Sequence, residues 1–332
     1  MTKGLLLINL GTPDNPNTTS VRQYLREFLA DKRVIDLPLP LRYALLYGFI
    51  LPTRTRQTIE AYQSIWTEQG SPLRYHSTQL CHTLQKELGE DYRVVIGMRY
   101  GNPSLLDALH SLRTCEHITV LPLYPQYSSA ATGSSIEYVL KAIASQTVFP
   151  SLNIIRDFHQ HPGFIQAQAH LIKPYLTDHD HLVLSYHGLP ERHLQQSGCQ
   201  KVCIEACPST TERSTNQSCY RAQCYQTTAS IAHALDLKLT FYNTGFQSRL
   251  GRTPWIKPYT DALLLELINR GITRLAIACP SFVADCLETL EEIGIRARAQ
   301  WQQLGGKQLT LIPCLNDHEL WIKAIIEGIK CP

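Results

Sequence analysis

Short apolar segments alternate with amphipathic segments along almost the whole chain, and this alternation restricts the fold more than any other feature of the sequence. The apolar segments carry Val, Ile and Leu at consecutive positions, which is typical of strands buried on both faces of a parallel sheet. The segments between them repeat apolar residues every three or four positions, as amphipathic helices do. Strands and helices in alternation indicate right-handed βαβ crossovers and parallel sheets.

We expect eight strands, four in each half of the chain. They are predicted at 4–10, 92–100, 117–124 and 152–158, and again at 181–187, 239–244, 274–279 and 308–314. Helices are predicted at 104–113, 134–144, 259–269 and 286–303, with a last helix at 317–329. The fold class is therefore α/β, with two similar doubly wound, Rossmann-like lobes on four-stranded parallel sheets. We expect an N-terminal lobe at 1–178, a C-terminal lobe at 179–315 and a C-terminal helix at 316–330.

Charge and motifs exclude several classes of function. The chain has 31 Lys and Arg against 28 Asp and Glu, a net charge of +3, which is too weak a basic field to indicate nucleic acid. It has no phosphate-binding loop, no Gly-x-Gly-x-x-Gly after a strand and no Gly-x-Ser-x-Gly elbow, so we expect neither a nucleotide nor serine hydrolysis. The apolar run 4–10 is too short for a signal peptide or a membrane span, and we expect a cytoplasmic protein.

Ligands of such sheets bind beyond the carboxyl ends of the strands, so the residues at those ends are candidates for chemistry. His187 ends one strand before the turn-forming Gly188-Leu189-Pro190; the alternative is a histidine that merely hydrogen-bonds at a strand end. Glu288 opens the helix after the seventh strand, where Asp285 and Glu288 also fit a capping box.

Two further strand ends carry aromatic or charged residues. Arg99 and Tyr100 end the second strand, where a guanidinium could meet a substrate carboxylate or be ordinary surface charge. The stretch 124–135 is dense in tyrosine, hydroxyls and small residues. It suits a flat aromatic ligand, but a simple turn between strand and helix is the alternative.

Together these motifs closely resemble the ferrochelatase family over almost the whole chain. The resemblance rests on five segments in the family's order: Asn9-Leu10-Gly11-Thr12-Pro13, Tyr124-Pro125-Gln126-Tyr127 with Thr132-Gly133-Ser134-Ser135, Ser185-Tyr186-His187-Gly188-Leu189-Pro190, Phe246-Gln247-Ser248-Arg249 with Pro254-Trp255, and Phe282-Val283-Ala284-Asp285-Cys286-Leu287-Glu288-Thr289-Leu290. It implies the class II chelatase fold and an enzyme, a lyase, that inserts Fe²⁺ into protoporphyrin IX to give protoheme and two protons without ATP.

The resemblance also implies roles for individual residues. His187 and Glu288 would face the metal across the porphyrin, and an imidazole with a carboxylate suits a reaction that needs a base and transient ligands. Glu292 would extend an acidic path for metal or protons. The porphyrin contacts would be Leu10, Tyr124, Tyr127 and Trp255 on the cleft walls, with Arg99 and Tyr100 at the substrate edges. Cys286 stands where some relatives carry histidine, which puts a second histidine ligand in doubt.

Five of the eleven cysteines crowd one insertion, 198–224, that the shorter bacterial members of the family lack. They are Cys199, Cys203, Cys207, Cys219 and Cys224. Thiols this close together in a reducing compartment indicate a metal rather than disulfides, and four could hold zinc or a [2Fe-2S] cluster. The resemblance favours the cluster, since one bacterial type takes its ligands from an internal segment; unmetallated thiols are the alternative. The other six are explained as buried reduced thiols.

Two alternative functions stay open, and so does the role of one apolar segment. The protein could be a chelatase for another tetrapyrrole or metal, or a tetrapyrrole-binding or iron-sulfur sensor that does not turn over. The apolar segment 37–52, too broken by proline to span a bilayer, matches the lip of the family's pocket. It indicates either peripheral contact with a membrane surface or a partly buried helix.

Overall fold

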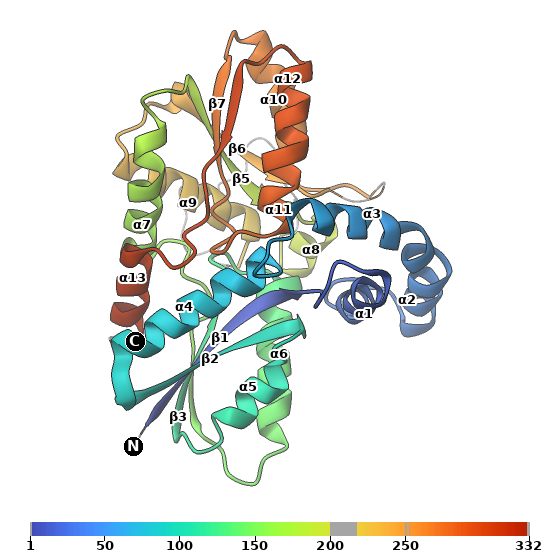
Figure 1. The fold of residues 1–332 in the computed structure, drawn as a ribbon, viewed down its shortest axis with the longest axis vertical. Helices are drawn as coiled ribbons and strands as arrows, with labels where there is room; N and C mark the ends of the chain where they lie inside the picture. The colour runs from blue at the N-terminus through green and yellow to red at the C-terminus, as the bar shows by residue number, and fades with distance from the viewer. Residues whose placement is uncertain (1, 200–217, 250, 252, 331–332) are drawn as a thin grey trace. The chain divides into compact units, whose positions relative to one another are not determined.

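Two four-stranded parallel sheets with the same strand order are the framework of the protein (Figure 1). The computed structural model describes residues 2–199, 218–249, 251 and 253–330. The first sheet has the order β2-β1-β3-β4 and the second β6-β5-β7-β8. Their bounds are β1 Lys3–Thr12, β2 Tyr92–Gly101, β3 His117–Pro122, β4 Ser151–Ile154, β5 His181–His187, β6 Tyr242–Gln247, β7 Arg274–Ala278 and β8 Gln308–Leu311. The predicted fold class is confirmed.

The chain divides into two compact units. Unit 1 comprises 1–124, 128–157 and 325–332, and unit 2 comprises 125–127 and 158–324. This division differs from the sequence boundary at 178 because helix α7 (Pro162–Ile172) packs on helix α9 (Tyr220–Ala234) and so belongs to unit 2. Helix α13 (Glu319–Lys330) is shared, with its first residues in unit 2 and its last in unit 1.

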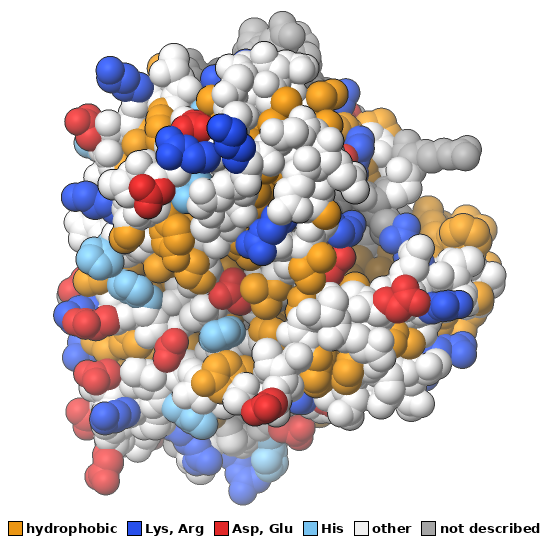
Figure 2. Space-filling view, turned by 45° about the horizontal axis from the view of Figure 1, so that its top comes forward, with side chains coloured by type: hydrophobic (Ala, Val, Ile, Leu, Met, Phe, Trp, Pro, Cys, Tyr) orange, Lys and Arg blue, Asp and Glu red, His pale blue; other side chains and the backbone are white. Residues whose placement is uncertain are grey.

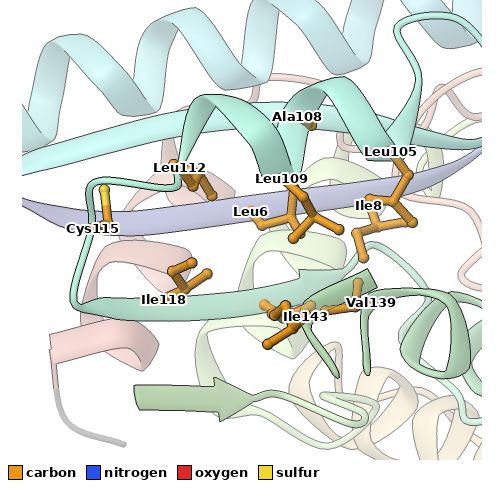
Figure 3. Close-up of a cluster of buried hydrophobic side chains, with 11 residues drawn as sticks. Leu6, Ile8, Leu105, Ala108, Leu109, Leu112, Cys115, Ile118, Val139 and Ile143 are labelled. Atoms are coloured by element: carbon orange, nitrogen blue, oxygen red, sulfur yellow. The ribbon is translucent and has the colours of Figure 1, made fainter. Parts of the chain in front are cut away.

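In unit 1 the core lies between the sheet and two helices, α5 and α6. Leu6 and Ile8 of β1 are fully buried against α5, and Val139 and Ile143 of α6 join the same cluster (Figure 3). Leu5 and Leu7, on the opposite face of β1, are also fully buried. The helices of this part of the chain are α1 Thr18–Leu29, α2 Leu39–Leu45, α3 Leu51–Ile65, α4 Pro72–Leu88, α5 Leu105–Ser111 and α6 Ser134–Ala144.

Unit 2 has a core of its own. Trp301 is fully buried with Leu264 and Leu267 against Val183 of β5 and Ile277 of β7. Strands with such apolar residues need cover on both faces, which explains the continuous apolar runs in the sequence. The remaining helices are α8 Glu191–Gln196, α10 Thr260–Asn269, α11 Leu287–Leu290 and α12 Arg298–Gln303.

Two predicted elements differ from the structure. The strand expected at 239–244 lies at Tyr242–Gln247 instead, because 239–241 form a 3₁₀ turn whose Leu239 is exposed. The helix expected at 286–303 is three pieces, α11, a π-helix at Glu292–Ala297 and α12. Both differences occur at the candidate site: the first places Gln247 at a strand end, and the second changes the helical pitch just after Glu288.

Buried thiols and surface charge agree with the sequence analysis where the structure describes them. Cys81, Cys115, Cys279, Cys286 and Cys314 are buried, and Cys331 lies outside the described residues. On the face shown in Figure 2, basic and acidic side chains are interspersed. Every helix in the described part of the chain is too short or too polar to serve as a transmembrane span.

Candidate active site

The ends of β5 and β6 lie side by side and bring the predicted site residues of unit 2 together. His187 is paired with Gln247 in the parallel register. The backbone N–H of Gly188 donates to the carbonyl of Gln247 at 2.8 Å. A Cβ atom at position 188 would lie 2.7 Å from that oxygen, so glycine is what permits the close approach. The strand ends are therefore joined directly beside His187.

His187 is held by its backbone, which leaves one ring nitrogen available. Its N–H donates to Oγ of Ser281 at 3.0 Å, and the hydroxyl of Tyr220 donates to its carbonyl at 2.8 Å. Nδ1 lies 2.6 Å from the carbonyl oxygen of Gly188. A carbonyl only accepts, so Nδ1 carries the proton and Nε2 presents its lone pair. Nε2 has no hydrogen-bond partner among the described residues.

Glu288 lies on the short helix α11, and the structure answers the question of its capping role. The N–H of Cys286 donates to Oγ1 of Thr289 at 3.0 Å, so Thr289 takes the part in the capping box that the sequence offered to Glu288. Asp285 is buried and accepts from the side chain of Asn316 at 2.9 Å. The carboxylate of Glu288 therefore does not take the capping-box position; it is partly exposed and lies beside the thiol of Cys286.

Gln247 links the strand end to the acidic helix. Its side-chain amide donates to the carbonyl of Glu288 at 2.6 Å and to Oε2 of Glu292 at 3.1 Å. Burial raises the pKa of Glu292 above its usual value, and the charge of Glu288 adds to this effect. A hydrogen bond from Ser248 and the charge of His187 oppose it. His187, Glu288 and Glu292 are thus near enough to influence one another electrostatically.

Comparison with known proteins places the chain in a family. A protein-family model described as ferrochelatase matches residues 2–331. The chain belongs to the ferrochelatase family. It is 58% identical over 325 residues to a ferrochelatase of Legionella pneumophila strain Paris, covering 98% of both chains. It is 47% identical over 332 residues to a ferrochelatase of Coxiella burnetii strain Dugway 5J108-111, covering 98% of this chain and 93% of the relative.

Solved structures share the fold at low sequence identity. The sirohydrochlorin chelatase SirB from Bacillus subtilis subspecies spizizenii in complex with cobalt aligns with a TM-score of 0.55 at 9% identity, covering 99% of this chain and 94% of that one. SirB from Bacillus subtilis with Fe³⁺ aligns with a TM-score of 0.54 at 12% identity, covering 99% and 95%. These likenesses support the chelatase fold of this ferrochelatase and no more than its fold.

Two porphyrin contacts, Trp255 and Tyr127, are expected in unit 2. Trp255 forms an isolated bridge with Pro190, and its ring would lie 3.3 Å from a Cβ at Gly188, so it stands beside the site. The backbone N–H of Tyr127 donates to the side chain of Gln223 at 2.6 Å.

Two of the contacts expected in unit 1, Arg99 and Tyr100, bind Asp31, a residue that the sequence analysis did not identify. Arg99 donates to Asp31 at 2.6 Å and to Ser134 at 2.7 Å, and the hydroxyl of Tyr100 donates to Asp31 at 2.9 Å. Burial by itself would raise the pKa of Asp31, but the hydrogen bonds and the charge of Arg99 together lower it. The guanidinium of Arg99 is thus already paired with a carboxylate inside its own unit.

The other two residues expected to line the cleft in unit 1 are Leu10 and Tyr124. Leu10 is partly exposed at the end of β1, where its N–H bonds the side chain of Asn9. Tyr124 has a buried hydroxyl near that of Ser135, and burial raises its pKa. No signal in the sequence identified Asp31, which follows α1 and ends no strand, whereas Gln247 and Ser248 stood in a quoted motif without a role.

The cysteine insertion is only partly within the described residues, since Cys203 and Cys207 lie outside them. Cys199 and Cys219 are partly exposed, and Cys224 on α9 is fully buried. Burial raises the pKa of the Cys224 thiol well above its usual value. Among residues 2–199, 218–249, 251 and 253–330, no three His, Cys, Asp or Glu side chains are grouped closely enough to hold a metal ion.

Proposed function

We propose that this ferrochelatase inserts Fe²⁺ into protoporphyrin IX, yielding protoheme and two protons in heme synthesis, and that His187 and Glu288 carry the reaction. The protein is a lyase by its family membership. One observation supports the residue assignment above all: His187, Glu288 and Glu292 converge on the joined ends of β5 and β6. These are the carboxyl ends of parallel strands, where α/β sheets bind their ligands.

The chemistry follows from what each side chain can do. The porphyrin must lose two pyrrole protons as the iron enters, and the lone pair on Nε2 of His187 can accept a proton from a pyrrole nitrogen. Fe²⁺ must exchange water for the four porphyrin nitrogens, and imidazole and carboxylate are ligands that hold it without trapping it. Glu288 serves as the oxygen ligand, and Glu292 accepts protons that leave the site. The two protons lost balance the two positive charges gained.

Substitution of the two residues tests this assignment. We expect His187→Ala and Glu288→Gln each to lower kcat for iron insertion by roughly a hundredfold or more, in an anaerobic assay that follows heme absorbance. His233→Ala, at an exposed histidine of α9, and Glu266→Gln, at an exposed carboxylate of α10, are the matched controls. Near-wild-type heme formation by both test variants, with unchanged circular dichroism, would remove the assignment.

We further propose that the insertion holds a [2Fe-2S] cluster on Cys199, Cys203, Cys207 and Cys219. Cys199 and Cys219 are partly exposed and bracket the segment, whereas Cys224 is fully buried on α9. A bound cluster would supply one-electron redox chemistry. The anaerobic visible spectrum tests it: Cys219→Ser should abolish the cluster absorbance and Cys224→Ser should retain it. A colourless wild-type protein with intact iron insertion would exclude the cluster.

We also propose that the apolar segment after α1 makes peripheral contact with a membrane surface, from which a hydrophobic porphyrin could be taken up. Leu39, Leu41 and Phe49 have exposed fractions of 58%, 60% and 61%. Several large apolar side chains exposed within one short segment favour an interaction surface over ordinary scatter. Its proline residues and short helices suit contact with the headgroup region rather than insertion.

A further inference from the structure

The motif Phe246-Gln247-Ser248-Arg249 has no part in the mechanism above, although two of its side chains contact the acidic helix. Gln247 and Ser248 both donate to the same atom, Oε2 of Glu292. The other carboxylate oxygen, Oε1, pairs with Arg296 at 3.3 Å. The position of the Glu292 carboxylate is therefore fixed from both sides.

Gln247 is oriented before it reaches Glu292. It is 6% exposed, and its Oε1 accepts from Oγ of Ser185 at 2.8 Å. Ser185 in turn shares a hydrogen bond of 2.8 Å with Thr260, and both are buried. Because the amide oxygen is held by a donor, the amide nitrogen must face the two acceptors on the acidic helix. The amide cannot turn without leaving buried groups unpaired.

Ser248 adopts a backbone conformation that only glycine takes readily. Its φ is 66°, in the left-handed region, which is strained for a residue with a Cβ atom. This conformation directs the hydroxyl to Oε2 of Glu292, at 2.5 Å. Glycine would remove the strain but would also remove the hydroxyl. The hydrogen bond from the Ser248 hydroxyl to Glu292 thus offsets the strain of the left-handed backbone at Ser248.

The contact matters because Glu292 begins the π-helix and stands one turn beyond Glu288. Without Ser248 and Gln247, this partly buried carboxylate would be held only by Arg296, on the exposed side of the helix, and would be free to turn towards solvent. We propose that Ser248 and Gln247 are positioning residues, which hold the Glu292 carboxylate beside Glu288 and His187 so that it can accept protons released by the porphyrin. This inference rests on the proposed function.

The test is a double-mutant cycle on iron insertion by the full-length protein. Ser248→Ala and Ser248→Gly should each lower kcat about tenfold, with the KM for porphyrin within twofold of wild type, as happens when a hydrogen-bonding partner behind a functional side chain is lost. In a Glu292→Gln background the same substitutions should cause no further loss, because the hydroxyl acts only through Glu292. Asp236→Ala is the control, since Asp236 is exposed and also has a left-handed φ, of 53°.

Two results would overturn the inference. If Ser248→Gly retained full activity while Ser248→Ala lost it, the residue would matter only for its backbone. If the losses from Ser248 and Glu292 simply added, the two would act independently. Ser248→Gly relieves strain, so it carries the test even if Ser248→Ala folds poorly. Failure of the wild-type protein itself to metallate porphyrin would instead contradict the proposed function. That result differs from the two above, in which the wild type is active and only the pattern among the variants is wrong.

Discussion

A single backbone carbonyl determines which nitrogen of His187 is available for chemistry. Because Gly188 O accepts from Nδ1 at 2.6 Å, the lone pair is on Nε2, and the ring is kept in one tautomer. The carbonyl is in turn fixed by the N–H of Gly188, which donates to Gln247 on the neighbouring strand. The tautomer of His187 therefore depends on a glycine that carries no functional group.

Substituting that glycine should disturb chemistry and stability together. In Gly188→Ala the new Cβ would lie 2.7 Å from the Gln247 carbonyl, so the two strand ends must separate. We expect kcat to fall by about tenfold to a hundredfold and the free energy of unfolding by about 1 to 3 kcal/mol. Gly48→Ala is the control, because a Cβ atom added at Gly48 would meet nothing within 4 Å. Unchanged kinetics and an unchanged urea midpoint for Gly188→Ala would refute this argument.

Among the secondary-structure elements, helix α6 carries a carboxylate, Glu137, that forms ion pairs with three basic side chains. Glu137 in the first turn pairs with Lys32, Arg33 and Lys141, at 3.1, 2.5 and 2.5 Å. The hydrogen bond from Lys141 and then that from Arg33 lower the pKa of Glu137 from 4.5 to about 2.

The sign of the resulting pH dependence follows from this lowered pKa. The ionised Glu137 stabilises the fold above pH 4.5, and its contribution declines as the pH falls from 4.5 towards 2. At pH 7 we expect Glu137→Gln to lower the free energy of unfolding by about 1 kcal/mol, because the cations are largely solvated. Urea unfolding at pH 7, 4 and 3 should show the difference from wild type shrinking. Glu68→Gln, an exposed carboxylate, should show no such trend.

At the scale of the whole molecule, two sheets of identical order each carry a cluster of candidate site residues. Unit 2 holds His187, Glu288 and Glu292 at its strand ends, and unit 1 holds the Arg99 and Asp31 cluster at the end of β2. Each unit has its own buried core. The same topology therefore positions an imidazole and carboxylates in one unit and a paired guanidinium in the other.

Membrane contact is a property of the whole protein and can be measured directly. We expect the wild-type protein to float with anionic liposomes in a density gradient, and a Leu39→Ser, Leu41→Ser and Phe49→Ser variant to remain at the bottom. Val148→Ser with Phe149→Ser is the matched control, because these side chains are 79% and 64% exposed on another segment. Flotation that is equal for all three proteins, or absent from all, would exclude the proposed surface.

Periodicity predicted most of the framework, because burial on both faces of a sheet requires continuous apolar runs. The strand at 181–187 is where the sequence places it, and α6 has its predicted bounds. The sixth strand was predicted three residues early, because Leu239 is apolar yet exposed and the polar residues 243 and 247 belong to the strand. Alternation reports burial, and it fails where a strand is short and ends in polar groups.

The sequence by itself determined the α/β class and the two equivalent sheets, because these depend on apolar periodicity. Its motifs carry the family resemblance, and that resemblance implies the pair His187 and Glu288. Only the tertiary structure decided the tautomer of His187, the release of Glu288 from capping, and the parts taken by Gln247, Ser248 and Asp31. Hydrogen bonds between residues far apart in the chain depend on the register and spacing of packed elements, which no local pattern encodes.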